Sequence, residues 1–181
     1  MLLRAKEKLE AARYFLEQMT KSLQDRKRFI YNLDAFLSIS RSVTFVLQSE
    51  FSSNYKFQEW YTVKQEKMRN DSLMTFFKDM RNITVKEGTP QTKAEAYISL
   101  KAGFNIKDSV SIKLKGANGT EELFEPLPTG DKKEGIESIV GSPVVSKYFF
   151  LENTDSDIIS LCTQYIEKLT NIVLEARMIL E

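Results

Sequence analysis

The chain has 181 residues, with 26 lysines and arginines against 25 aspartates and glutamates, and it contains no histidine. A net charge of +1 provides no overall field that attracts nucleic acid or anionic lipid. The lack of histidine and the single Cys162 exclude an ordinary zinc site, an intrachain disulfide and histidine-based catalysis, so we expect neither a metal nor another cofactor.

Chain length and segment pattern indicate one domain outside the membrane. A chain of this size buries roughly 70% of the surface that its unfolded form exposes, which is enough for a single core. Met1–Leu3 is followed at once by Arg4 and Lys6, and no apolar run approaches the ~18 residues that a membrane-spanning helix needs. We therefore expect a cytoplasmic protein without a membrane partner.

The first ninety residues have the periodicity of four amphipathic helices. Apolar residues recur every three or four positions from 2 to 23, and a second helix over about 25–51 carries two adjacent apolar stripes. Breaks at Ser52-Ser53-Asn54 and Asn70-Asp71-Ser72 separate a third and a fourth helix, because Asn and Asp favour the residue before a helix. The fourth helix is expected to end before Gly88.

The period changes to two between about 94 and 150. Val110, Ile112 and Leu114 alternate with polar residues, and Asn118-Gly119 is a hairpin signal before a return strand over 120–125. Further strand candidates are 97–100 and 144–151, and the last helix is expected to start with acidic residues at 154–157 and to reach about 180.

These patterns predict a mainly α (α+β) fold of about five helices. An inserted β hairpin or small antiparallel sheet precedes the last helix. The expected organisation is a single domain over 1–181, with the helical bundle formed by 1–90 and 152–181 and the β insertion at about 94–150.

The end of the fourth helix contains the segment Arg81-Asn82-Ile83-Thr84-Val85-Lys86. An Arg-Asn pair followed four residues later by a basic residue resembles the motif of the HEPN superfamily, helical-bundle ribonucleases and nucleotide-handling proteins whose motif ends in His. Lys86 occupies the place of that His. The resemblance implies an HEPN-like bundle, a homodimer with a cleft between protomers, and a partner such as a nucleotidyltransferase or an antitoxin.

Four residues are the candidate phosphate- or RNA-binding set. The resemblance supplies Arg81, Asn82 and Lys86, and Arg41 of the second helix is added as a further cation. Arg41 belongs to a polar and aromatic stripe that consists of Tyr31, Asp34, Ser38, Arg41, Phe45 and Gln48. The simpler alternatives are that Arg81 pairs with an acidic neighbour, that Lys86 is a solvated cation at a helix end, and that the stripe is satisfied inside the bundle.

Aromatic residues gather at the start of the third helix, namely Tyr55, Phe57, Trp60 and Tyr61. Such residues stack on bases in nucleic-acid sites, but their helical spacing favours packing in the core or at a dimer interface. Cys162 lies on the apolar face of the last helix and is expected to be an inert core thiol.

Together these features predict a non-catalytic RNA- or nucleotide-binding or regulatory module, of the toxin–antitoxin or defence type that the resemblance implies. One alternative is a metal-independent endoribonuclease with Arg81 and Lys86 as catalytic residues. Lysine has an ordinary pKa near ~10.4 and would need a shift of roughly three units to serve as a base at neutral pH. Another alternative is a structural protein-interaction module that uses the β segment as a recognition edge.

Overall fold

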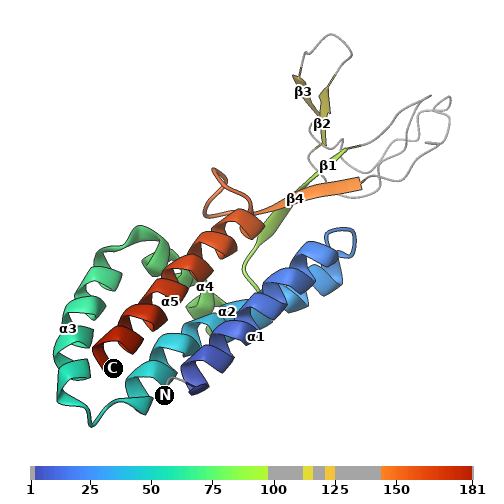
Figure 1. Cartoon of the computed structure of the whole chain (residues 1–181). Helices are drawn as coiled ribbons and strands as arrows, with labels where there is room; N and C mark the ends of the chain where they lie inside the picture. Colours follow the sequence, from blue (N-terminus) through green and yellow to red (C-terminus); the bar gives the residue numbers. More distant parts are fainter. Residues whose placement is uncertain (1–2, 98–111, 116–120, 125–143, 181) are drawn as a thin grey trace, which may run out of the picture. The chain divides into compact units, whose positions relative to one another are not determined.

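The structure is a computed structural model that describes residues 3–97, 112–115, 121–124 and 144–180. Within these ranges the chain is mainly helical, with short antiparallel strands before the last helix, which confirms the predicted fold class (Figure 1). The elements are α1 (Leu3–Lys21), α2 (Arg26–Glu50), α3 (Tyr55–Asn70), α4 (Ser72–Lys86), β1 (Thr92–Tyr97), β2 (Ile112–Lys115), β3 (Glu121–Phe124), β4 (Val144–Phe150) and α5 (Ile158–Leu180).

The chain divides into two compact units. The helical unit consists of Met1–Pro90 and Ile158–Glu181, and the strand unit consists of Gln91–Asp157. All five described helices therefore belong to the first unit, and all four described strands belong to the second.

The helix boundaries follow from local hydrogen bonds that the sequence itself specifies. Side-chain oxygens of Asp25, Asn54 and Asp71 each accept the backbone N–H three residues further on at 3.0 Å, at the starts of α2, α3 and α4. At the end of α4, Gly88 has a φ of 107° and its N–H donates to the carbonyl of Ile83 at 3.1 Å. A positive φ is favourable for glycine, so the predicted end of the fourth helix is confirmed.

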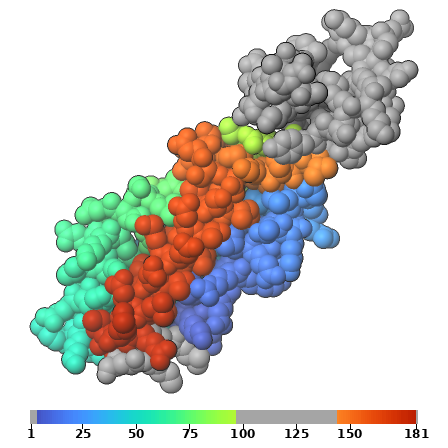
Figure 2. Space-filling model, turned by 45° about the horizontal axis from the view of Figure 1, so that its top comes forward, coloured from blue at the N-terminus to red at the C-terminus, as the bar shows by residue number. Residues whose placement is uncertain are grey.

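The core of the helical unit is centred on α5. On the face shown in Figure 2, α5 lies between α1 and the segment formed by α3 and α4. Nine residues of α5 are buried, and Tyr165 among them stacks on Phe77 of α4 with ring centroids 4.2 Å apart. Cys162 is also buried, as predicted for an inert core thiol.

Polar contacts between described residues join α5 to α1, to α3 and to the start of α4. Arg13 of α1 donates to Thr170 Oγ1 at 2.8 Å. Lys64 of α3 pairs with Glu175 at 2.6 Å, and Lys168 pairs with Asp71, the residue that caps α4, at 2.5 Å. The contacts of Lys64 and Lys168 are charged and directional, so they favour one position of α3 and of the start of α4 along α5.

In the strand unit, β1 pairs with β4 and β2 pairs with β3, both antiparallel. The pairing of β2 and β3 confirms the strands predicted around Ile112 and within 120–125, whereas Val110 and the turn at 118–119 lie outside the described residues. Of the strand predicted at 97–100, only Tyr97 is described, as the last residue of β1, and 98–100 lie outside the described residues. The strand residues 92–96 were not predicted. Ala94 and Ala96 of β1 alternate with charged residues and give only a weak strand signal.

The start of the last helix also differs from the expectation. α5 begins at Ile158, so Asp155 and Asp157 precede the helix and do not form its first turn. The side chain of Asn153 accepts the N–H of Asp155 at 3.2 Å, and this local turn competes with helix formation there. Within the described ranges, no helix is both long and apolar enough to cross a membrane.

Candidate anion-binding site

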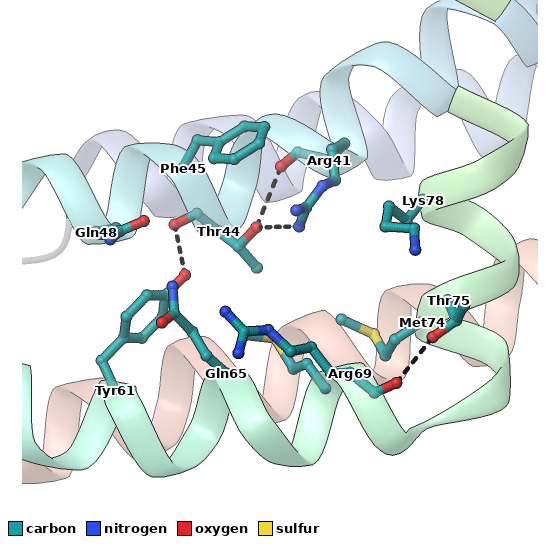
Figure 3. A pocket seen from close by; sticks show the side chains of 11 residues that line it. Arg41, Thr44, Phe45, Gln48, Tyr61, Gln65, Arg69, Met74, Thr75 and Lys78 are labelled. Carbon is teal, nitrogen blue, oxygen red and sulfur yellow. Dashed lines mark hydrogen bonds between the residues drawn. The ribbon is translucent and has the colours of Figure 1, made fainter. Parts of the chain in front are cut away.

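A pocket of about 220 Å³ opens in the helical unit between α2, α3 and α4 (Figure 3). Each helix contributes one cation to it: Arg41 from α2, Arg69 from α3 and Lys78 from α4. The remaining described lining residues are neutral: Thr44, Phe45, Gln48, Tyr61, Gln65, Met68, Met74 and Thr75. None of the eleven described lining residues is an aspartate or glutamate, so the charge of the pocket is positive.

Arg41 is held in the pocket by its own helix. Its Nη1 donates to Thr44 Oγ1 at 2.9 Å, and its guanidinium carbon lies 4.4 Å from the centre of the Phe45 ring. Arginine has five N–H donors, and the described residues provide a side-chain acceptor for only one of them. The guanidinium is half-buried and meets no carboxylate among the described residues, so it is a fixed cation that lacks an anion.

Thr44 and Tyr61 form the closed side of the pocket. Both are buried, and the Tyr61 hydroxyl donates to the Thr44 carbonyl at 3.0 Å, which joins α3 to α2. Burial raises the pKa of Tyr61 above its ordinary value of 10.0, and the positive charge of Arg41 offsets this only in part. The phenol is therefore protonated at neutral pH and acts as a hydrogen-bond donor.

Arg69 and Lys78 complete the cationic lining from the open side. Both side chains are exposed at the surface of the pocket, and in Figure 3 the side chains of Arg69 and Lys78 extend toward the space below Arg41. The Thr75 hydroxyl donates to the Arg69 carbonyl at 3.1 Å, which holds the end of α3 against α4. Lys78 pairs with its neighbour Asp79 at 3.3 Å, an exposed contact that is weak and easily exchanged for another anion.

Of the four site residues predicted from the sequence, the pocket includes Arg41 only. Arg81 is half-buried and donates to the Asn82 side chain at 3.4 Å, and Lys86 is exposed in the last turn of α4. Arg81 and Lys86 are five positions apart in the sequence, which places them about 140° apart around α4, so they do not share a face. Arg81 follows Lys78 by three positions and lies beside it on α4.

Only part of the polar stripe of α2 lines the pocket. Arg41, Phe45 and Gln48 line it, whereas Asp34 accepts the hydroxyl of Thr89, in the segment after α4, at 2.8 Å. Among the aromatic residues of α3, Phe57 and Tyr61 are buried as the packing interpretation expected, but 71% of Tyr55 is exposed.

Sequence reasoning missed Arg69 and Lys78. They lie nine positions apart on two helices, and no periodicity links them. Arg69 is at the end of α3 and Lys78 is two turns into α4, so only the angle between these helices brings them to one pocket.

The fold and the pocket define a helical protein with a cationic groove on three helices. Comparison with known proteins then gives its family: the model described as "Bacteriophage lambda protein ea47" matches residues 2–140, and the chain belongs to this family. The curated "Protein ea47" of Escherichia phage lambda is 35% identical over 77 residues, which are 42% of this chain and 19% of that protein. The matched region thus spans about a fifth of the relative. No solved structure matches the chain.

This membership corrects the resemblance to HEPN, which is wrong. The family model and the curated relative both point to the ea47 family. The resemblance depended on Arg81, Asn82 and Lys86, three positions with a lysine in the place of the family's histidine, and such a short basic pattern is common at the end of any helix. The HEPN-like cleft, the nucleotidyltransferase or antitoxin partner and the toxin–antitoxin role therefore have no support.

Proposed function

We propose that the helical unit is a non-catalytic binding module for a phosphate-bearing ligand, RNA or a nucleotide, and that the ligand's phosphate lies in the pocket formed by α2, α3 and α4. The single observation that carries this proposal is the half-buried guanidinium of Arg41, oriented by Thr44 and Phe45 and without a carboxylate among the described residues. A cation fixed in this way binds an anion without losing further side-chain freedom.

The size and chemistry of the pocket favour phosphate over a bulky anion. A volume of about 220 Å³ is smaller than the ~300–1,000 Å³ of pockets that enclose a whole drug-sized ligand. A phosphate group fits, and its several oxygens can accept bonds from Arg41, Arg69 and Lys78. The rest of the ligand then lies on the surface at the exposed ring of Phe45.

Binding without cleavage is proposed because the pocket offers no suitable proton-transfer group. The chain has no histidine, and the described lining contains neither a carboxylate nor a thiol. The Tyr61 phenol, whose pKa is raised by burial, holds its proton at neutral pH. A general base works best when its pKa lies near the working pH.

Calorimetric titration with inorganic pyrophosphate and with AMP at low salt tests the proposal. We expect binding that weakens tenfold or more in Arg41→Gln, because a hydrogen-bonded charged partner contributes ~1.5–3 kcal/mol. Lys78→Gln should also weaken binding, and Arg41→Lys should have an intermediate effect because it keeps the charge but loses the planar group.

Arg4→Gln and Lys67→Gln are the matched controls, since both remove an exposed positive charge outside the pocket. They should bind as the unaltered chain does. Equal losses in the controls and in the pocket variants, or no affinity for either probe, would disprove the proposed function. Thermal unfolding of every variant separates a binding defect from a folding defect.

A further inference from the structure

The exposed face of α2 carries two pairs of a cation and an aromatic ring. Lys27 Nζ lies 5.7 Å from the centre of the Tyr31 ring, and the Arg41 guanidinium lies 4.4 Å from the centre of the Phe45 ring. In both pairs the cation precedes the ring by four residues, so each pair spans one helical turn. Tyr31 is 60% exposed and Phe45 is 50% exposed, so at least half of each residue is open to solvent.

The two rings lie along one line on the helix. Tyr31 and Phe45 are fourteen positions apart, which corresponds to nearly four full turns and places them within about 40° of each other around α2. The same count gives a separation of about 21 Å along the helix axis. Ser38, halfway between them, is exposed and small, so it does not obstruct the surface.

The stripe also contains one carboxylate, Asp34. Its Oδ2 accepts the Thr89 hydroxyl at 2.8 Å, and its Oδ1 is buried without a hydrogen-bond partner among the described residues. On α4, Lys78 lines the pocket, and Arg81 lies three residues further along the same side of the helix. The stripe therefore offers aromatic surfaces at both ends and basic residues beside each of them.

This arrangement has the chemistry that single-stranded nucleic acid requires. Bases stack on exposed aromatic rings whatever their sequence, and nearby cations contact the phosphates. Paired bases in a duplex do not present their faces in this way, and a mononucleotide reaches only one of the two rings. A stacked strand advances ~3.4 Å per nucleotide, so about 21 Å corresponds to roughly six steps, which join about seven nucleotides.

We propose that the ligand is a single-stranded nucleic acid that lies along α2, with one base on Phe45, the adjoining phosphate in the pocket, and a second base on Tyr31. The bound part of the strand is about seven nucleotides long. This inference rests on the proposed function, because the pocket must bind phosphate for the strand to be anchored. It adds the length of the ligand, its single-stranded form and the role of Tyr31, which does not line the pocket.

Fluorescence anisotropy with labelled oligouridylate and oligothymidylate of two to twelve nucleotides tests it on the full chain at low salt. Affinity should rise with length up to about seven nucleotides and then level off. Tyr31→Ala and Phe45→Ala should each weaken binding of an eight-nucleotide strand by about 5- to 150-fold, the equivalent of ~1–3 kcal/mol per stacked base. The RNA and DNA series show which strand the protein prefers, and preference for either supports the proposal.

Tyr55→Ala is the matched control, because Tyr55 is 71% exposed on α3 and lies outside the stripe. It should bind strands as the unaltered chain does. Tyr31→Leu and Phe45→Leu keep an apolar side chain without a flat ring, so they provide a second test if an alanine variant folds poorly. Loss of affinity should be similar in the leucine and alanine variants.

The outcomes separate the two proposals. One outcome is that pyrophosphate binding depends on Arg41, but dinucleotides bind as tightly as longer strands or Tyr31→Ala has no effect. In that case the phosphate pocket is supported and the strand model is wrong. Equal affinity for a duplex, or equal competition by poly-glutamate, overturns the strand model as well. If neither pyrophosphate nor any strand binds, both proposals fail together.

Discussion

Phe77 of α4 and Tyr165 of α5 stack face to face in the core, with ring centroids 4.2 Å apart and planes only 3° from parallel. Both side chains are almost completely buried. Phe77 also packs edge to face with Phe36 of α2, with ring centroids 6.1 Å apart. The pair thus joins three helices of the unit, and its loss should affect the wall that carries Lys78, one residue after Phe77.

The first prediction concerns this aromatic pair. Phe77→Ala should reduce the free energy of unfolding by ~3–5 kcal/mol, because a buried ring is replaced by a cavity. A double-mutant cycle with Tyr165→Leu should reveal a coupling of ~0.5–1.5 kcal/mol beyond the lost apolar area. Urea unfolding measures both, and Val85→Ala on the exposed side of α4 should change stability by less than ~0.5 kcal/mol. A similar small effect for Phe77→Ala would contradict the described core.

The second prediction concerns alkaline pH. Burial raises the pKa of Tyr165 to about 12, against the opposing effect of the positive charge on Arg41. In the unfolded chain the phenol ionises near its ordinary value of 10.0, so the folded state should lose stability as the pH rises from 10 toward 12. Tyr165→Phe should remove part of this loss when unfolding is measured from pH 8 to pH 11. Tyr14→Phe, an exposed control, should keep the full loss.

The third prediction concerns acid pH and the start of α4. Burial alone would raise the pKa of Asp71, but bonds from Lys168 and from the Met74 amide outweigh it and hold the pKa below the ordinary value of 3.8. The stabilisation is therefore complete above 3.8 and is lost as the pH falls through the lower folded pKa.

Asp71→Asn is the variant that isolates this charge, since asparagine still caps a helix but does not pair with Lys168. We expect it to be less stable than the unaltered chain at pH 7 by ~0.2–1 kcal/mol, with the difference shrinking as the pH falls below 3.8. Chemical unfolding between pH 2.5 and pH 7 provides the measurement. A constant difference over this range would show that the charge of Asp71 is not responsible.

The fourth prediction concerns salt. A single strand with one phosphate in the pocket and another beside Lys27 should bind with a slope of about −1.4 in a plot of log affinity against log salt concentration, since each neutralised phosphate contributes about −0.7. Arg41→Gln should make the slope less steep by up to about 0.7, whereas Phe45→Ala should lower affinity without changing the slope. Anisotropy titrations between 50 and 300 mM salt distinguish these cases. An unchanged slope in Arg41→Gln would place Arg41 away from the phosphates.

The helices could be predicted from the sequence because their signals are local. Asp25, Asn54 and Asp71 bond to amides three residues away, and Gly88 provides the backbone conformation that ends α4. Strand β1, whose residues 92–96 were not predicted as a strand, shows the limit of this approach. Its alternating alanines and charges become a strand only through pairing with β4, some fifty residues later in the chain.

The candidate site was predictable only where it lies on one helix. Arg41, Phe45 and Gln48 follow the spacing of α2, so the stripe that contains them was visible in the sequence. Arg81 and Lys86 were predicted to share a site because they form a short motif, but they lie about 140° apart around α4. A motif of three residues fixes neither the family nor the direction of its side chains.

The sequence by itself determined the helices, their caps and the repeated cation and ring pairs of α2, because these depend on contacts within one or two turns. Tertiary structure alone decided that Arg69 and Lys78 join Arg41 in one pocket. The approach of α3 and α4 to α2 is set by how buried side chains such as Phe77, Tyr61 and Tyr165 pack together, and packing of this kind depends on residues far apart in the chain.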